Sequence, residues 1–321
     1  MRYLVTGGAG FIGSQFLETL VDNVEPLDSI KVLDLLTYSG NLQNLEKVLT
    51  IPNVSFIQGD ISNPSLVDEI MSETDVVIHF AAESHVDRSI GDSSVFFKTN
   101  VSGTVTLLQA AVKHNISKFV HVSTDEVYGS ISKGSWNENF PLAPNSPYAA
   151  SKAGSDLAAL AFFKTHQLNV NITRCCNNYG KRQYPEKVIP LFITNLLRGR
   201  KIPIYGNGQN IREWITVDDH CQGILSIISN GKPGEVYNLG SGYEISNMEL
   251  ARKVLEILGK SQSYIEFVPD RKGHDARYSL NFEKAKLELG FEPDVNFDKH
   301  LRRTIDWYVE NEEWWTPLVI K

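Results

Sequence analysis

The sequence of 321 residues is short of the features that mark several specialised classes of protein. Its three cysteines, Cys175, Cys176 and Cys221, form no C-x-x-C pair, so we expect neither a disulfide framework nor a cysteine metal site. No run approaches the roughly 18 consecutive apolar residues that a membrane span needs. The first residues carry no apolar signal segment, and the eight histidines show no metal-binding spacing. We therefore expect a cytoplasmic protein without a metal ion or a membrane partner.

An excess of positive charge is also missing. Lys and Arg number 31 against 38 Asp and Glu, which gives a formal net charge of −7 with neutral histidines. A chain that binds the phosphate backbone of a nucleic acid normally carries a basic surface, so a nucleic-acid partner is disfavoured. Small anionic ligands are still allowed, because a helix N-terminus and one or two arginines can hold a phosphate whatever the net charge is.

Short strands alternate with helix-length segments through the first half of the chain. Runs rich in β-branched residues predict strands at residues 3–6, 30–34, 54–57, 76–80, 119–123 and 170–173. Segments 11–21, 64–71, 95–113 and 148–166 have the length and pattern of helices. This alternation predicts a doubly wound α/β fold, in which helices cover both faces of a parallel sheet. Ligands of such sheets bind beyond the carboxyl ends of the strands.

The alternation breaks down after residue 180. Prolines such as Pro185, Pro203 and Pro269 interrupt shorter elements there, so we expect a smaller C-terminal mixed α/β lobe that binds the substrate. We place the domains at 1–180 and 181–321. The boundary is soft, because no Gly/Ser linker separates the two parts and their segments can interleave.

A glycine-rich turn lies between the first strand and the first helix. Glycine at positions 7, 10 and 13 permits a tight turn and lets a pyrophosphate approach the helix N-terminus. Asp34 ends the second strand 21 positions after Gly13, at the offset where a carboxylate accepts the adenosine ribose hydroxyls. The pattern predicts a Rossmann-type NAD site, since this carboxylate would repel the 2′-phosphate of NADP. Asp60, after the third strand, either meets the adenine or caps the next helix, and the sequence leaves both roles open.

Two further motifs carry candidate chemistry. Tyr148 and Lys152 lie at i and i+4 of a predicted helix and share one face. An ammonium near a phenol favours the phenolate, so the pair can remove a proton from a substrate hydroxyl. Thr124, Asp125 and Glu126 stand at the carboxyl end of the strand 119–123. If their surroundings separate the pKa values of the two carboxyls, one can donate a proton while the other accepts one. Taken alone, Tyr and Lys at this spacing are common on solvated helix faces, and such an acid triplet is more often a helix N-cap or a turn. The Gly-rich turn is what favours the functional interpretation of the Tyr/Lys pair.

Together with other segments, these motifs give the chain a family resemblance. It resembles the extended short-chain dehydrogenase/reductase sugar-nucleotide enzymes, and within them the nucleoside-diphosphate-glucose 4,6-dehydratases, nearly from end to end. The matching segments are TGGAGFIGS at 6–14, AAESHVDRSI at 81–90, VSTDEVYGS at 122–130, PNSPYAASKA at 144–153, TRCCNNYG at 173–180 and DRKGHDARYSL at 270–280. The Thr-Asp-Glu triplet separates the dehydratases from related 4-epimerases and decarboxylases, which lack this acid pair.

The resemblance implies an NAD-dependent lyase reaction on a nucleoside-diphosphate-glucose, with thymidine as the usual base. Tyr148 would take the proton of the glucose 4-hydroxyl as hydride leaves C4 for NAD. The new keto group acidifies C5, so that Glu126 can remove the C5 proton while Asp125 protonates the departing 6-hydroxyl. Hydride then returns to C6 and leaves a 4-keto-6-deoxyglucose nucleotide. A homodimer built on the helices at 95–113 and 148–166 is also implied.

The resemblance further assigns a set of contact residues. Thr124 joins Asp125, Glu126, Tyr148 and Lys152 as catalytic. Cofactor contacts are implied for Gly7, Gly10, Phe11, Ile12, Gly13, Asp34, Leu35, Leu36, Thr37, Asp60, Ile61, Ala81, Ala82, Ser84, Thr99, Tyr148, Lys152 and Asn178. Sugar-nucleotide contacts are implied for Ser84, His85, Thr124, Asn177, Lys187, Val188, Pro203, Tyr205, Arg212, Asn247, Arg271, His274 and Tyr278. The two arginines are the natural diphosphate clamps, because a guanidinium binds phosphate oxygens in pairs.

Three alternatives accompany this interpretation. A UDP-glucose 4,6-dehydratase would need only a small change in the base pocket. A sugar-nucleotide 4-epimerase shares the oxidation at C4 but needs no elimination catalyst, so the acid pair argues against it. A silent NAD-binding protein would have no use for the acid pair and the Tyr/Lys pair together. In one loop, Lys181 and Arg182 stand where relatives usually have Pro-Tyr, which leaves the contacts of that loop open.

Overall fold

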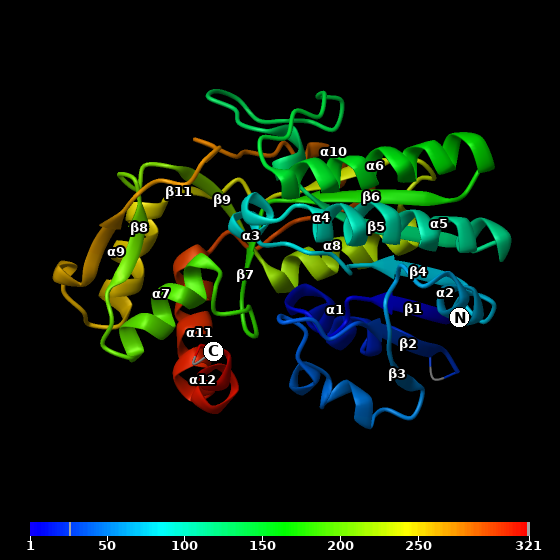
Figure 1. The fold of residues 1–321 in the computed structure, drawn as a ribbon, viewed down its shortest axis with the longest axis horizontal. Coiled ribbons are helices and arrows are strands. Elements are labelled where there is room, and N and C mark those ends of the chain that lie inside the picture. Colours follow the sequence, from blue (N-terminus) through cyan, green and yellow to red (C-terminus); the bar gives the residue numbers. More distant parts are fainter. Residues whose placement is uncertain (26, 320–321) are drawn as a thin grey trace.

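A seven-stranded parallel sheet forms the centre of the protein (Figure 1). The computed structural model describes residues 1–25 and 27–319. The strands lie in the order β10-β6-β5-β4-β1-β2-β3, so the direction of strand addition reverses between β1 and β4, where such sheets open a binding crevice. Their bounds are β1 (Arg2–Thr6), β2 (Ser29–Asp34), β3 (Val54–Gln58), β4 (Val76–His79), β5 (Lys118–Thr124), β6 (Val170–Cys175) and β10 (Val236–Leu239). The predicted doubly wound fold is confirmed.

Helices cover both faces of this sheet. On one face α1 packs on α8, which also contacts α10, and on the other α5 lies between α2 and α6. Strand β5 is buried along its whole length, as expected for a strand covered on both faces. The bounds are α1 (Phe11–Val21), α2 (Pro64–Met71), α5 (Thr104–Lys113), α6 (Pro147–His166), α8 (Val217–Asn230) and α10 (Glu283–Leu289). The limits predicted for the first two helices agree with the structure.

Three elements of the second half of the chain belong to the central layers, namely β10, α8 and α10, which packs on both of the others. β10 adds to the edge of the sheet by pairing in parallel with β6, and α8 packs against α1. This is the interleaving that the soft boundary at residue 180 allows. The central sheet and the helices that cover it are therefore not formed by one continuous segment of the sequence.

The helix predicted at 95–113 is interrupted. It consists of α4 (Ser94–Phe96), a π-helical stretch η3 (Phe97–Gly103) and α5. Asn100 in the π stretch holds the loop after β4, because its amide accepts from the Glu83 N–H at 2.8 Å and donates to the Glu83 carbonyl at 3.0 Å. Its Nδ2 also donates to the Ser151 hydroxyl at 2.8 Å on α6. Such π segments are frequent at functional sites, and hydrophobic periodicity does not reveal them.

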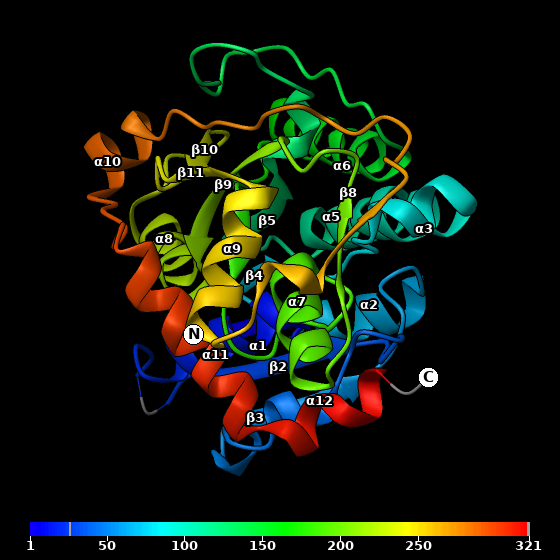
Figure 2. The same ribbon diagram turned by 90° about the vertical axis from the view of Figure 1, so that its left-hand side faces the viewer.

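The second part of the molecule has its own apolar core, centred on residues such as Phe192, Trp214, Leu301 and Trp315. Figure 2 shows its helices packed beyond the ends of the central strands. Its small sheets are β11-β9-β7 and the parallel pair β12-β8. The bounds are β7 (Asn177–Tyr179), α7 (Val188–Leu197), β8 (Ile202–Tyr205), β9 (Ile211–Thr216), β11 (Glu244–Ser246), α9 (Asn247–Ile257), β12 (Ile265–Val268), α11 (Phe297–Glu310) and α12 (Glu312–Val319). The short helix α3 (Val86–Gly91) lies with the central sheet, where it packs on α6. Within the described part of the chain, no helix is long and apolar enough to cross a bilayer.

Candidate active site

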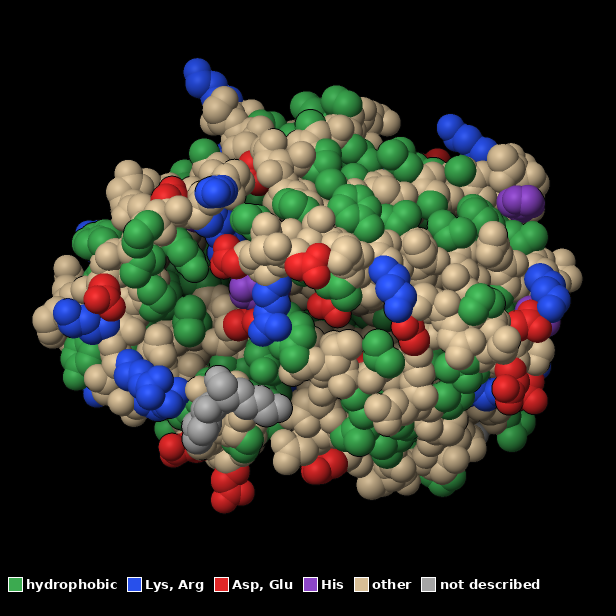
Figure 3. Space-filling view, in the orientation of Figure 1, with side chains coloured by type: hydrophobic (Ala, Val, Ile, Leu, Met, Phe, Trp, Pro, Cys, Tyr) green, Lys and Arg blue, Asp and Glu red, His purple; other side chains and the backbone are tan. Residues whose placement is uncertain are grey.

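A cavity of about 600 Å³ lies between the carboxyl ends of the central strands and the second part. Residues of both parts line it, and charged side chains of both signs gather near this junction on the face drawn in Figure 3. All the predicted catalytic residues line the cavity, and so do all the predicted cofactor and substrate residues except Leu36 and Tyr278. Residues from distant parts of the sequence therefore share one site.

Leu36 and Tyr278 do not line the cavity. Leu36 is a turn residue with a positive φ of 55°, and its side chain packs on the main core while its N–H donates to Asp34 Oδ1 at 2.8 Å. Tyr278 lies under Arg212, with its ring centre 4.2 Å from the guanidinium carbon, and its hydroxyl donates to Asp275 Oδ2 at 2.6 Å. Both residues support a neighbour that lines the cavity.

The glycine-rich turn is packed so tightly that side chains would not fit. Gly7 has a φ of +70°, and a Cβ there would lie 2.5 Å from the backbone nitrogen of Ala81. A Cβ on Gly13 would lie 2.3 Å from the Gly7 carbonyl oxygen. The turn thus brings bare backbone and the N-terminus of α1 to the cavity wall, which is the surface that a pyrophosphate requires.

Asp34 is held in place by the backbone around it. Its Oδ2 accepts from the Ala9 N–H at 2.9 Å and its Oδ1 from the Leu36 N–H. Burial raises the pKa of this carboxyl, and the two backbone hydrogen bonds act against that rise. Each oxygen has a second lone pair, so a buried carboxylate in this position can still accept hydroxyl groups of a ribose.

Asp60 lines the same wall, and it does not cap the next helix. Its Oδ1 accepts from the Ser62 N–H at 2.8 Å, while the cap of α2 is Asn63, whose side chain accepts from two backbone N–H groups. Asn178 also lines the cavity, and His220 of α8 orients it through a contact of 2.9 Å between His220 Nδ1 and Asn178 Oδ1.

Helix α6 positions the Tyr/Lys pair. Ser146 caps its N-terminus by accepting from the Ala149 N–H at 3.1 Å, and Pro147 is its first residue. Lys152 is buried and its Nζ donates to the Val122 carbonyl of β5 at 2.7 Å. Burial lowers the pKa of this lysine to about 8, and the charge of Asp156 acts against the fall.

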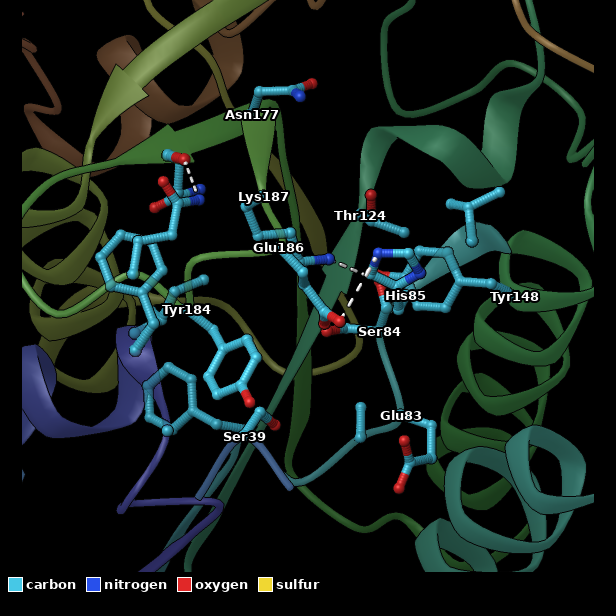
Figure 4. A pocket seen from close by; sticks show the side chains of 18 of the residues that line it. Ser39, Glu83, Ser84, His85, Thr124, Tyr148, Asn177, Tyr184, Glu186 and Lys187 are labelled. Carbon is cyan, nitrogen blue, oxygen red and sulfur yellow. Dashed lines mark hydrogen bonds and ion pairs between the residues drawn. The ribbon is translucent and has the colours of Figure 1, made fainter. Parts of the chain in front are cut away.

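Tyr148 points into the cavity beside His85 and Thr124 (Figure 4). Burial is the main cause that raises the pKa of its phenol, and the charges of Glu126 and Asp125 raise it further. A hydrogen bond with Thr124 acts in the opposite direction. Burial and the neighbouring carboxyls thus favour the protonated form of the phenol.

The acid pair lies on a single 3₁₀ turn, η4 (Asp125–Tyr128), at the end of β5. Burial raises the pKa of both carboxyls, but their neighbours differ. Asp125 faces the carboxyl groups of Glu126 and Glu213, which raise its pKa further. Glu126 faces Lys187 and Arg212, which lower its pKa. Arg212 and the Thr124 hydroxyl act against the rise at Asp125, and the charge of Asp275 adds to the rise at Glu126. Both pKa values therefore lie above their ordinary values, and that of Asp125 is raised more strongly. This order favours Asp125 as the proton donor and Glu126 as the acceptor.

The far wall of the cavity carries three cations. Lys187 Nζ donates to the Ser84 carbonyl at 2.8 Å (Figure 4). Arg212 is buried and its Nη2 donates to the Asp275 carbonyl at 2.9 Å. Arg271, on the loop after β12, forms an ion pair of 3.1 Å with Asp87 of α3 across the cavity mouth. This wall has the charge that a diphosphate requires.

Several residues at the mouth of the cavity were not predicted from the sequence. Glu186 lines the cavity, accepts from the Tyr38 hydroxyl at 2.7 Å and from Arg88 Nη2 at 3.1 Å, and lies 3.7 Å from His85 Nε2. The Arg88 guanidinium stacks over the Tyr38 ring at 3.6 Å. These residues come from three separate segments, so no local motif could have joined them.

The loop that departs from the usual pattern binds α1. Lys181 Nζ donates to Glu18 Oε2 at 2.6 Å, and Arg182 lies 2.9 Å from the same oxygen. Arg182 also donates to the Asn44 carbonyl at 2.9 Å. Neither residue lines the cavity, so the departure changes how the loop is anchored rather than the surface that a ligand meets.

The fold and the cavity define a class. The class is that of dinucleotide-dependent enzymes with a Rossmann-type sheet, and the cationic far wall suits a second, anionic ligand. Among the described residues, no group of three His, Cys, Asp or Glu is placed to bind a metal ion.

Comparisons with known proteins narrow this class. The family model described as GDP-mannose 4,6 dehydratase matches residues 4–304. A dTDP-glucose 4,6-dehydratase of Actinoplanes sp. is 53% identical over 320 residues, which cover 98% of this chain and 100% of the relative. The crystal structure of DesIV, a dTDP-glucose 4,6-dehydratase from Streptomyces venezuelae with NAD and TYD bound, is 55% identical with a TM-score of 0.97, over 99% of this chain and 100% of that one.

The chain belongs to the extended short-chain dehydrogenase/reductase family of sugar-nucleotide 4,6-dehydratases. The fold alone would not separate it from epimerases. A UDP-glucose 4-epimerase of Thermotoga maritima, solved with UDP-glucose, has a TM-score of 0.90 at 31% identity, over 97% of this chain and 100% of that one. The distinction has to come from the side chains of the site.

Proposed function

We propose that this protein is a dTDP-glucose 4,6-dehydratase, an NAD-dependent hydro-lyase that converts dTDP-glucose into dTDP-4-keto-6-deoxyglucose and water. The observation that carries the proposal is the acid pair, Asp125 and Glu126, buried in one cavity with Tyr148 and Lys152. Oxidation and reduction at C4 alone would need only the Tyr/Lys pair. Two carboxyls whose pKa values are raised to different extents are useful when a proton must be taken from C5 and another given to the 6-hydroxyl.

The cofactor is NAD, and the residues present fit it. The bare backbone of Gly7 and Gly13 and the N-terminus of α1 suit the pyrophosphate, and Asp34 suits a ribose that lacks a 2′-phosphate. In this arrangement Asp60 would face the adenine, and Lys152 would hold the ribose next to the nicotinamide. When bound, NAD accepts the hydride of C4 and returns it to C6, and its cationic nicotinamide favours the Tyr148 phenolate.

Tyr148 serves as the base for the first step. Its phenolic oxygen takes the proton of the 4-hydroxyl as C4 is oxidised. Lys152, with a pKa lowered to about 8 by burial, is charged at neutral pH and is held by the Val122 carbonyl. The Thr124 hydroxyl makes a hydrogen bond with the Tyr148 phenol. This contact holds Thr124 next to the 4-hydroxyl of the sugar.

The acid pair carries out the elimination. Glu126 removes the proton from C5, which the 4-keto group has made acidic, and Asp125 protonates the 6-hydroxyl as the C6–O bond breaks and water leaves. The cations Lys187 and Arg212 favour the charged form of Glu126. The neighbouring carboxyls favour the protonated form of Asp125. Glu126 then delivers a proton to C5. Tyr148 is left protonated and Asp125 ionised, so a proton must leave Tyr148 and another must reach Asp125, by way of solvent, before the next cycle begins.

The sugar nucleotide occupies the far wall. Arg212 and Arg271 are placed to hold the diphosphate, because both guanidinium groups line the cavity beyond the acid pair. Ser84, His85, Asn177 and Lys187 surround the glucose in this arrangement. The residues of α7, β8 and α9 that line the cavity, among them Val188, Pro203 and Asn247, form the side where the base lies.

The assembly and the location stay predictions. The helices expected to form a homodimer carry exposed apolar side chains, with Val95 41%, Phe97 42% and Leu157 58% exposed, and apolar side chains are frequent over α5 and α6 in Figure 3. Such side chains on neighbouring helices favour burial against a second copy. We also propose a cytoplasmic location and a division of the chain into two domains at residue 180.

The purified protein, without added NAD, should be incubated in parallel with dTDP-glucose and UDP-glucose and followed by proton NMR. We expect a new 6-methyl signal from dTDP-glucose, since the cofactor is regenerated in every cycle. A methyl signal from UDP-glucose alone would move the assignment to the uridine nucleotide. The absence of methyl product from both, or conversion to the galactose epimer, would contradict the proposal.

A further inference from the structure

A row of buried polar side chains runs beneath the active site. Asp156 Oδ2 accepts from Arg174 Nε at 2.9 Å, and Arg174 Nη1 donates to the Tyr128 hydroxyl at 2.8 Å. The Tyr128 hydroxyl in turn donates to Asn238 Oδ1 at 2.9 Å. All four side chains are buried, and none of them lines the cavity. The reaction proposed above uses none of these groups.

This row joins the two elements that carry the chemistry. Asp156 lies on α6, one turn after Lys152 and two turns after Tyr148. Tyr128 is the last residue of η4, two positions after Glu126. Arg174 stands on β6 between them, and Asn238 stands on the edge strand β10. The guanidinium therefore ties the helix of the proposed base to the turn of the acid pair.

The turn is held by its core packing and by one bond to the following loop: Val127 is buried in the main core, and its carbonyl accepts from the Ala143 N–H at 3.0 Å. Its own hydrogen bonds are weaker. The Gly129 N–H donates to the Glu126 carbonyl at 3.2 Å, and the Glu126 N–H donates to the Thr124 hydroxyl at 3.3 Å, so both hydrogen bonds are long. Gly129 follows with a φ of +86° and starts the next loop. Beyond the packing of its ring on Trp136, with 5.4 Å between ring centres, Tyr128 anchors the turn through its hydroxyl.

We propose that the Tyr128 hydroxyl, bridged to Asp156 by Arg174, is a positioning group for the elimination step. It fixes the turn of Asp125 and Glu126 against α6, so that both carboxyls meet the sugar that Tyr148 orients. A planar guanidinium suits this place because it contacts Asp156 and Tyr128 at once in a fixed geometry. The proposal rests on the dehydratase function. It means that residues outside the cavity set the positions of the two carboxyls in the elimination step.

The test compares Tyr128→Phe with wild type on two substrates. The first substrate is dTDP-6-deoxyglucose, which has no 6-hydroxyl to lose. With it, oxidation at C4 is measured by the near-ultraviolet absorbance of reduced nicotinamide. The action of Glu126 is measured separately, by deuterium uptake at C5 in D₂O. With dTDP-glucose, single-turnover methyl formation reads the elimination. A displacement of about 1 Å can cost about 100-fold in rate, so we expect C5 exchange and methyl formation to fall at least about tenfold while C4 oxidation changes by less than about twofold.

Tyr237→Phe is the matched control. Tyr237 is a buried tyrosine on β10, and its hydroxyl also makes two hydrogen bonds, accepting from the Lys232 N–H at 3.1 Å and donating to Glu288 Oε2 at 3.0 Å, away from the cavity. All three rates should stay near wild type in this variant. A similar selective loss in Tyr237→Phe would show a general effect of buried hydroxyls and would overturn the proposal.

Arg174→Lys gives a second route if Tyr128→Phe fails to fold. Lysine keeps the charge beside Asp156, but it lacks a second nitrogen that could contact Tyr128 at the same time. We therefore expect the same selective loss. Equal losses in all three rates, or no loss in any of them, would overturn the positioning role. The absence of methyl product from wild-type protein would instead contradict the dehydratase function, so the two failures can be told apart.

Discussion

The two walls of the cavity are built in different ways. The cofactor wall consists largely of backbone and small residues from the first strands of one sheet, and its one buried carboxyl, Asp34, is fixed by two backbone N–H groups. The substrate wall consists of long charged side chains from separate loops and elements, such as Lys187, Arg212 and Arg271. The first wall is rigid because close packing leaves no alternative, whereas the second depends on side chains that contact one another.

The difference shows how each wall responds to substitution. On the cofactor wall a single added methyl group meets backbone, which cannot move aside. On the substrate wall a lost charge changes the proton affinity of a neighbour or frees another side chain. Substitutions on the first wall should therefore act on cofactor binding and stability, and those on the second on individual steps of the reaction.

Glu126→Gln should have the largest effect on turnover, with product formation falling by about 10²- to 10⁴-fold, as expected for loss of a general base. Bound NAD should remain at the wild-type level, because only the deprotonation of C5 is removed. Product is measured by proton NMR, and NAD by the absorbance of nucleotide released on denaturation. If the variant is isolated without NAD, Glu126 also supports the cofactor wall. The two walls would then not respond differently to substitution as described above.

Gly7→Ala should remove bound NAD and destabilise the fold. The left-handed backbone costs about 1–2 kcal/mol for a non-glycine residue, and the contact with the Ala81 backbone adds about 1–3 kcal/mol. Gly134→Ala is the matched control, since Gly134 has a similar φ of +74° but no atom within 4 Å of its Cβ position. Urea unfolding of both variants separates the two costs, and equal losses would show that packing at Gly7 contributes nothing.

Lys187→Met should shift the acidic limb of the turnover–pH profile to higher pH. Lys187 lowers the pKa of Glu126, so its removal lets burial raise that pKa further. The base must be unprotonated to act, and the enzyme would therefore lose activity at a higher pH as the solution is acidified. Lys187→Arg keeps the charge and should leave the limb in place. An unshifted profile in Lys187→Met would show that Glu126 does not set this limb.

Asp87→Asn should have the smallest effect. The ion pair with Arg271 is partly exposed, so the free energy of unfolding should change by less than about 1 kcal/mol. Freeing the guanidinium for the diphosphate should lower KM for the sugar nucleotide by about two- to threefold, which corresponds to a surface pair of this strength. Initial-rate measurements check this. A rise in KM would mean that Asp87 orients Arg271 rather than competing for it.

Much of the fold and of the cofactor wall could be predicted from sequence. The glycine turn, the offset to Asp34 and the limits of α1 and α2 are local, because each depends on residues that are neighbours in the chain or one strand apart. The strand β10 was missed. It has only four residues, Val236–Leu239, and it joins the sheet by pairing with a strand more than 60 positions earlier.

The substrate wall and its supports were harder to predict without the family resemblance. Glu186 gained its place through Tyr38 and Arg88, which lie about 100 positions or more away in the sequence. Tyr278 was assigned to the ligand, but the structure turns its hydroxyl to Asp275 and puts Arg212 above its ring. The π-helical turn at Asn100 arises from contacts with the Glu83 backbone and Ser151, which no periodicity contains.

The central claim, that hydride leaves C4 and returns to C6 of the same sugar, is tested most directly with dTDP-glucose deuterated at C4. The protein should be incubated with it in ordinary water without added NAD, and the product examined by NMR and mass spectrometry. We predict that the deuterium appears in the new 6-methyl group and not at C5, which receives its proton from Glu126. A methyl group free of deuterium, or a 4-epimer that keeps deuterium at C4, would contradict the account.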